Sequence, residues 1–203
     1  MLIQGILVTR VATLEDSLLW PHNKGVCSIK SAITSLFQRQ QVLWDKARWN
    51  WIWASPCPKK IQIFLWKAQQ DRLPTKTFLA FGRPSMDLRC SRCHCPKTTI
   101  HILQDCPWAR EVWRQSPDLL PMSFFQLPLQ EWLRQNTTME GTLLHHHLPW
   151  QFYFPFTCWK LWLARNERMF KAHSQTQHSL IFSLVQAATE FHFLAGTTKQ
   201  TSV

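Results

Sequence analysis

Apolar residues recur every three or four positions in several short segments, and prolines separate most of these segments. This spacing places the apolar side chains on one face of a helix, which can pack against a core. Thr75 suits an N-cap, and Pro58 and Pro107 suit the first turn of a helix. The pattern predicts helices near residues 31–39, 49–53, 58–72, 75–81, 107–113, 128–136, 154–171 and 180–194.

The residues between these segments predict irregular structure. A short extended piece is expected at 26–29, a Pro-rich connector at 117–128, a loop at 136–149 and a polar, frayed tail from Gly196. The chain holds twelve tryptophans and thirteen phenylalanines. In the last two helices the residues expected to face the core are Trp159, Trp162, Leu163, Phe170, Leu184, Val185, Ala188 and Phe191. We therefore expect a mainly α fold, with short helices around an aromatic-rich core and at most a small N-terminal β element.

Positive charge is concentrated in the first half of the chain. The 203 residues carry a formal net charge of +11, and residues 46–97 hold eleven basic side chains against two acidic ones. Such a field attracts polyanions, with nucleic acid first and an anionic membrane surface second. Charge alone does not decide between this interpretation and a basic surface that has no specific partner.

The sequence contains no stretch of the ~20 apolar residues that a membrane-spanning helix needs, and its start lacks the cleavage site of a secretory signal. We therefore expect an intracellular protein without membrane contact; nucleus and cytoplasm are both open. The cysteine count of seven is odd. In a reducing compartment clustered cysteines are more often metal ligands than disulfides.

Four of these cysteines and two of the nine histidines fall within residues 90–106. The spacing is Cys90-x2-Cys93-x7-His101-x4-Cys106. A two-residue gap lets the chain turn so that both sulfurs face one point, and the second pair can complete a tetrahedron. The pattern predicts a Cys3His knuckle for structural Zn²⁺, with no open position for a reactive water.

Two further residues leave the ligand set open. Cys95 could replace Cys93 with a four-residue gap, and His94 could replace His101. Spacing favours the first set and does not exclude the others.

The surroundings of Cys106 support its role. Pro107 suits the first helical position, which makes Cys106 the N-cap, where the helix dipole favours a thiolate. Arg89 and Arg92 would offset negative charge on the sulfurs. Because residues 82–104 contain few large apolar side chains, a metal would order a loop that packing cannot.

These residues also resemble a known family, the zinc-binding region of reverse transcriptases from plant LINE-type (non-LTR) retrotransposons. The resemblance spans most of residues 16–171. It is carried, in order, by Trp53, Pro58-Lys59, Phe64, Trp66, Leu73-Pro74-Thr75, Cys90, Cys93, His101, Cys106-Pro107 and Val112-Trp113. The segment WPHNKGVCSIKSAI is similar to the part preceding this region, and CWKLWLARNERMF to the linker toward a ribonuclease H domain.

The resemblance implies a division of the chain into parts. These are an upstream segment at 1–43, a zinc-binding domain at 44–116, a Pro-rich connector at 117–150, a helical linker segment at 151–195 and a tail at 196–203. The sequence has no Tyr/Phe-x-Asp-Asp polymerase motif and no carboxylate cluster suited to two-metal hydrolysis. We therefore expect a non-enzymatic fragment from the middle of a longer polyprotein.

The function expected from these observations is a non-catalytic, zinc-stabilised module that binds RNA or DNA through phosphate contacts. The candidate contacts are Lys59, Lys60, Lys67, Arg72, Lys76, Arg89, Arg92 and Lys97. One alternative is a scaffold that packs the polymerase and ribonuclease H domains of the parent polyprotein together. Another is an inactive, truncated piece of a retroelement.

Overall fold

The computed structural model describes residues 46–80, 87–115, 120–143, 147–171 and 174–200. The extended piece and the helix expected at 26–39 lie outside these residues. From Ala47 onward the chain forms one compact unit.

Each helix predicted within the described residues is present, with its ends shifted by several residues in places. The helices are α2 (Lys46–Trp53), α3 (Lys59–Gln69), α4 (Lys76–Leu79), α5 (Pro107–Arg114), α6 (Leu129–Thr138), α7 (Trp150–Phe170) and α8 (Gln177–Gln200). The local signals act as expected, since the Thr75 hydroxyl accepts the Phe78 N–H at 3.1 Å and Pro107 occupies the first turn of α5. The mainly α fold is confirmed.

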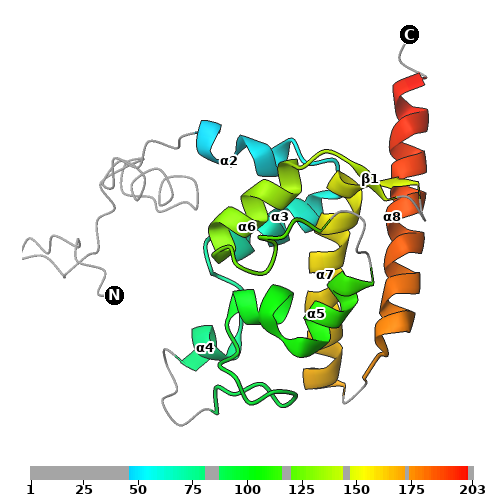
Figure 1. Cartoon of the computed structure of the whole chain (residues 1–203). Coiled ribbons are helices and arrows are strands. Elements are labelled where there is room, and N and C mark those ends of the chain that lie inside the picture. Colours follow the sequence, from blue (N-terminus) through cyan, green and yellow to red (C-terminus); the bar gives the residue numbers. More distant parts are fainter. Residues whose placement is uncertain (1–45, 81–86, 116–119, 144–146, 172–173, 201–203) are drawn as a thin grey trace, which may run out of the picture. The chain divides into compact units, whose positions relative to one another are not determined.

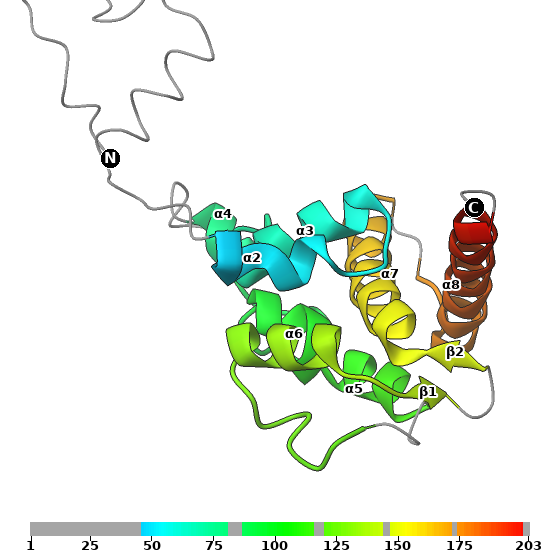
Figure 2. The ribbon, with the colours of Figure 1, turned by 90° about the horizontal axis from the view of Figure 1, so that it is seen from above.

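Helix α7 lies at the centre of the unit. It packs against α8 on one side and against α3 and α6 on the other, as Figures 1 and 2 show. It also contacts the short π-helix η2 (His101–Asp105), which precedes α5. The segment expected as a linker toward another domain is therefore packed against the cysteine-rich region.

An aromatic cluster forms the core between α5, α6 and α7. Trp113 is fully buried, and its ring centroid lies 5.1 Å from Phe124, 5.8 Å from Trp132 and 5.4 Å from Phe154. The indole N–H of Trp113 donates to the carbonyl of Leu103 at 2.8 Å, so the one polar group of this buried ring is hydrogen-bonded. The rings closest to Trp113 thus come from α6, α7 and the segment before α6, and not from the cysteine-containing segment.

Two expectations about the connections and helix faces are wrong. Residues 136–149 are not all loop, because α6 continues to Thr138, and β1 (Thr142–Leu143) pairs antiparallel with β2 (Leu148–Pro149). Phe170 is 77 % exposed and not in the core, since it lies at the last residue of α7. Helix α8 extends to Gln200 and so includes Gly196, where the polar tail is expected to begin.

The connector contributes to the core as well. Phe124 lies in the Pro-rich stretch, yet its side chain is fully buried in the aromatic cluster. A bulky ring gains enough from burial to anchor an otherwise irregular segment.

Among the helices of the described residues, none is both long enough and apolar enough to cross a membrane.

Candidate metal centre

The first half of the candidate site is a tight turn. The Cys90 N–H donates to the Cys95 carbonyl and the His94 N–H donates to the Cys90 carbonyl, both at 2.8 Å. His94 sits at the left-handed position of this turn, with φ of 59°. The Lys97 N–H closes the loop on the Leu88 carbonyl at 3.0 Å. The backbone thus directs Cys90 and Cys93 to the same side.

The second half comes from the start of a helix. The Thr98 hydroxyl accepts the His101 N–H at 3.2 Å, which begins η2, and the Cys106 N–H donates to the His101 carbonyl at 2.8 Å. Cys106 is the N-cap of α5, followed directly by Pro107, as the sequence predicts. One π-type turn therefore places the imidazole and the third sulfur side by side.

The four side chains converge. The three sulfurs and one imidazole nitrogen all lie within 4.8 Å of one another. The Nε2 atom of His101 is 3.3 Å from the Cys93 Sγ. A tetrahedral set with metal–sulfur bonds of ~2.3 Å has its donors about 3.8 Å apart, so this group is close to that geometry. Cys90, Cys93, His101 and Cys106 are positioned to bind one metal ion.

The open alternatives do not join this group. The side chain of Cys95 is exposed, and its Sγ donates weakly to the Cys93 carbonyl at 3.5 Å. His94 is also exposed. Cys57 and Cys158 are buried elsewhere, and Cys158 lies in the core as the sequence indicates. Burial raises the pKa of both of these thiols, to about 11 for Cys57, which disfavours the thiolate form that reacts and binds metals.

The ionisation of the clustered cysteines depends on a nearby cation. Burial raises the pKa of Cys90, but hydrogen bonds from the Arg92 backbone and the His101 ring outweigh it and bring that pKa to about 6. Burial, and then the sulfurs of Cys90 and Cys106, raise the pKa of Cys93 to about 12. Without a cation, the crowded sulfurs cannot all be thiolates at neutral pH, whereas a divalent ion reverses that balance.

The segment at 87–100, which we call the cysteine-rich loop, packs against the C-terminal half of α7. The Arg168 guanidinium donates to the Ser91 hydroxyl at 2.9 Å, and the Arg92 guanidinium donates to the Ser174 hydroxyl at 3.2 Å. Arg92 also stacks on the Trp108 ring at 4.2 Å. Sequence reasoning missed Arg168; its only signal was a basic residue at the end of an aromatic helix.

The candidate nucleic-acid contacts are spread over the unit. Three of them, Lys59, Lys60 and Lys67, have exposed side chains on α3, and Arg72 is exposed just after that helix. Arg89 is exposed too, whereas Lys76 is half-buried and pairs with Asp87 at 3.7 Å. Only Arg92 and Lys97 line the pocket beside the cysteines, and Lys97 is 1 % exposed.

Comparison with known proteins agrees with the site. Residues 27–113 match the sequence model of a family described as zinc-binding in reverse transcriptase. The match includes the whole Cys3His group, and this part of the chain is therefore similar to the zinc-binding regions of reverse transcriptases. The matched domain is a zinc-binding one and not a catalytic one. No curated protein and no solved structure matches the chain.

Proposed function

We propose that this protein is a non-catalytic module that binds nucleic acid and is held in shape by one structural Zn²⁺ ion, derived from a plant LINE-type reverse transcriptase. The observation that carries the proposal is the convergence of Cys90, Cys93, His101 and Cys106 within 4.8 Å. Three thiolates and one imidazole form a donor set that suits zinc and leaves no position for a substrate water.

Metal analysis tests the zinc part. We expect one zinc per chain in the purified protein, retained by Cys95→Ser and lost by Cys106→Ser. Cys95 is the matched control because it lies in the same loop but outside the convergent group. Loss of zinc from both variants to the same extent would contradict the assignment of ligands.

The nucleic-acid part is supported by the exposed basic residues near the start of α3. Lys59 and Lys60 are both exposed, and the first turn of this helix contains no acidic residue. Phosphate contacts made there would depend strongly on salt, because binding releases counterions. Glutamates at these positions would suit the helix dipole, so the charge reversal should leave α3 folded.

The test is the affinity for a labelled single-stranded RNA as a function of salt. We expect Lys59→Glu with Lys60→Glu to weaken binding at least tenfold and to lower the salt slope. The control is Arg114→Glu with Arg134→Glu, which makes the same change in net charge at exposed positions on α5 and α6. Equal effects in the two double variants would mean that only net charge matters, and an unchanged affinity and slope would refute the proposal.

A scaffold role is the second candidate, and the surface of α8 favours it. Phe182 and Phe193 are each 70 % exposed, and an open cavity with about 960 Å³ of empty space, lined in part by Phe182, lies on the same helix. Exposed aromatic side chains on one helix are typical of a docking surface. If α8 packs against a polymerase or ribonuclease H domain, Phe182→Ser should abolish co-elution with that separately expressed domain.

A further inference from the structure

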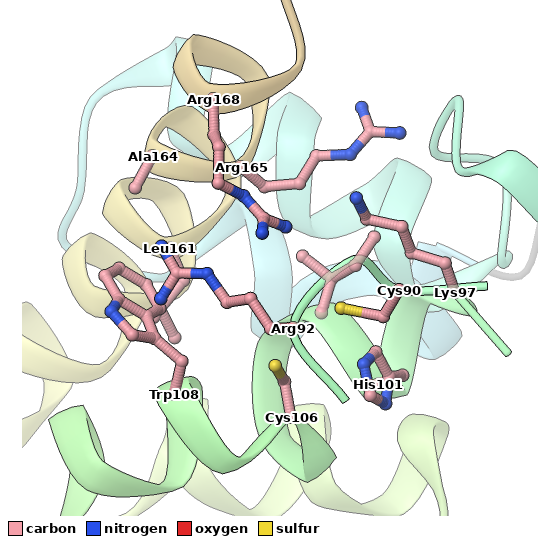
Figure 3. Close-up of a pocket in the computed structure, with 11 residues that line it drawn as sticks. Cys90, Arg92, Lys97, His101, Cys106, Trp108, Leu161, Ala164, Arg165 and Arg168 are labelled. Carbon is pink, nitrogen blue, oxygen red and sulfur yellow. The ribbon is translucent and has the colours of Figure 1, made fainter. Parts of the chain in front are cut away.

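A group of basic side chains shares one pocket with three residues of the metal centre, Cys90, His101 and Cys106. A pocket with about 350 Å³ of empty space, part of it open to solvent, lies between the cysteine-rich loop and α7. Four of its lining residues are cationic, and we call them the basic pocket: Arg92, Lys97, Arg165 and Arg168. Figure 3 shows Arg165 and Arg168 reaching from α7 toward the loop that carries Arg92 and Lys97.

Among the described residues that line this pocket, none carries a carboxylate. The polar partners of its arginines are neutral: Arg165 donates to the Asn166 amide oxygen at 2.7 Å, and Arg168 and Arg92 donate to serine hydroxyls. Burial, and then repulsion by Arg165 and Arg168, lower the pKa of Lys97 to about 8. Burial and the charge of Arg168 also lower the pKa of Arg165. The positive charges therefore destabilise one another.

Two of the cationic groups are buried without a full set of partners. Arg165 is 7 % exposed, and its Nε atom has no hydrogen-bond partner. Lys97 is 1 % exposed, and its ammonium group donates to the Met169 thioether, a weak acceptor, at 3.3 Å. Buried cations normally have a counter-charge, because the loss of hydration is otherwise uncompensated.

The metal centre supplies only part of that counter-charge. Three thiolates around a divalent ion carry a net charge of minus one. The four cations of the basic pocket carry plus four, so the described lining of the pocket keeps three positive charges in excess when the metal site is filled. An oxyanion with several acceptor oxygens fits this excess, because guanidinium groups bind phosphate oxygens in pairs.

We infer that the basic pocket binds a phosphate group, and that under the proposed function, on which this second part rests, the group is a phosphodiester of the nucleic-acid strand. Arg165 and Arg168 donate to its oxygens from α7, and Lys97 and Arg92 from the cysteine-rich loop. One bound phosphate group thereby contacts both the cysteine-rich loop and α7.

Arg168→Gln in the zinc-loaded full chain tests the inference. Ser91→Ala is the matched control, since it removes the hydrogen bond that Arg168 donates but leaves the charge in place. Arg168→Lys keeps the charge and serves as a second variant. The probes are inorganic phosphate, followed by the rise in the unfolding midpoint, and a labelled single-stranded RNA, followed by anisotropy across salt concentrations. Zinc content and the circular dichroism spectrum report folding.

We expect Arg168→Gln to weaken binding of both probes about tenfold and to lower the RNA salt slope by about 0.7, the contribution of one phosphate contact in a single strand. Ser91→Ala should bind as the unaltered chain does, and Arg168→Lys should lose less affinity than Arg168→Gln. If phosphate binding falls and RNA binding does not, the pocket takes free phosphate and the nucleic-acid part of the inference is wrong. If the unaltered chain binds no RNA but binds phosphate through Arg168, the pocket stands and the proposed function fails. Unchanged phosphate binding in Arg168→Gln, or an equal loss in Ser91→Ala, would overturn the pocket.

Discussion

Removing the metal ion should disorder residues 87–100 and leave α7 folded. We expect this segment to depend on the ion because few large apolar side chains pack it against the rest of the unit. Its large apolar side chains are Leu88, which is 37 % exposed, and the half-buried Ile100. Helix α7, in contrast, is packed against α3, α6 and α8, and Trp150 and Phe154 are fully buried.

The size of the effect follows from the residues involved. Ordering the fourteen residues 87–100 requires about 14 kcal/mol at ~1 kcal/mol of backbone entropy per residue. The four backbone hydrogen bonds donated by Cys90, His94, Lys97 and Thr98 contribute about 4 kcal/mol at ~1 kcal/mol each. The deficit of about 10 kcal/mol lies at the lower end of the ~10–16 kcal/mol that structural zinc supplies in zinc-finger peptides.

Hydrogen exchange measured by mass spectrometry checks this prediction. The zinc-loaded chain and the chelator-treated chain are compared over peptides covering 87–100 and 150–165. We expect protection of the first peptide to fall to that of an unstructured chain, because the Cys90 and His94 amides lose their acceptors. The second peptide should keep most of its protection.

Two results would contradict the prediction that the metal ion orders residues 87–100 while α7 stays folded without it. Persistent protection of 87–100 after metal analysis shows complete removal would mean that packing alone orders the loop. Loss of protection across 150–165 to the same extent would mean that the aromatic cluster does not stabilise the core independently. Cys95→Ser, treated in the same way, controls for effects of altering a thiol in the loop.

Three more predictions follow from the same contacts. Zn²⁺ affinity should rise at least about tenfold per pH unit between pH 7 and 9, because Cys93, with a pKa of about 12, must still release its proton there, whereas Cys90, with a pKa of about 6, is already ionised. Below pH 6 the slope should steepen, and competition with a chromophoric chelator measures both slopes. Trp113→Phe should lower the free energy of unfolding by about 1–3 kcal/mol in urea titrations, since the buried Leu103 carbonyl loses its N–H donor. The Cys158 thiol should resist alkylation in the folded protein and react only on unfolding, because it is fully buried and its pKa is raised.

Local signals in the sequence accounted for the helices and for the choice of ligand candidates. Thr75 and Pro107 mark helix starts through interactions with their own neighbours, and these operate wherever the helix packs. The same holds for the turn between Cys90 and Cys93, whose shape depends on hydrogen bonds a few residues apart. Such features can be predicted from the sequence because the interacting residues lie within a few positions of one another.

Other features were decided by contacts between distant residues. Whether Cys95 or Cys93 faces His101 depends on the direction of two side chains in a folded loop, and spacing allows either. Phe124 belongs to the core because α5 and α6 meet over it, although its own segment predicts a connector.

The mainly α fold and the set of candidate ligands could be predicted from the order of residues alone, because both follow from periodicity and short-range spacing. Only the tertiary structure brought Arg165 and Arg168 of α7 against Arg92 and Lys97 of the loop. Those pairs are separated by more than sixty positions along the chain. Their charges interact through space, and the sequence pattern does not show which distant residues lie together in the folded chain.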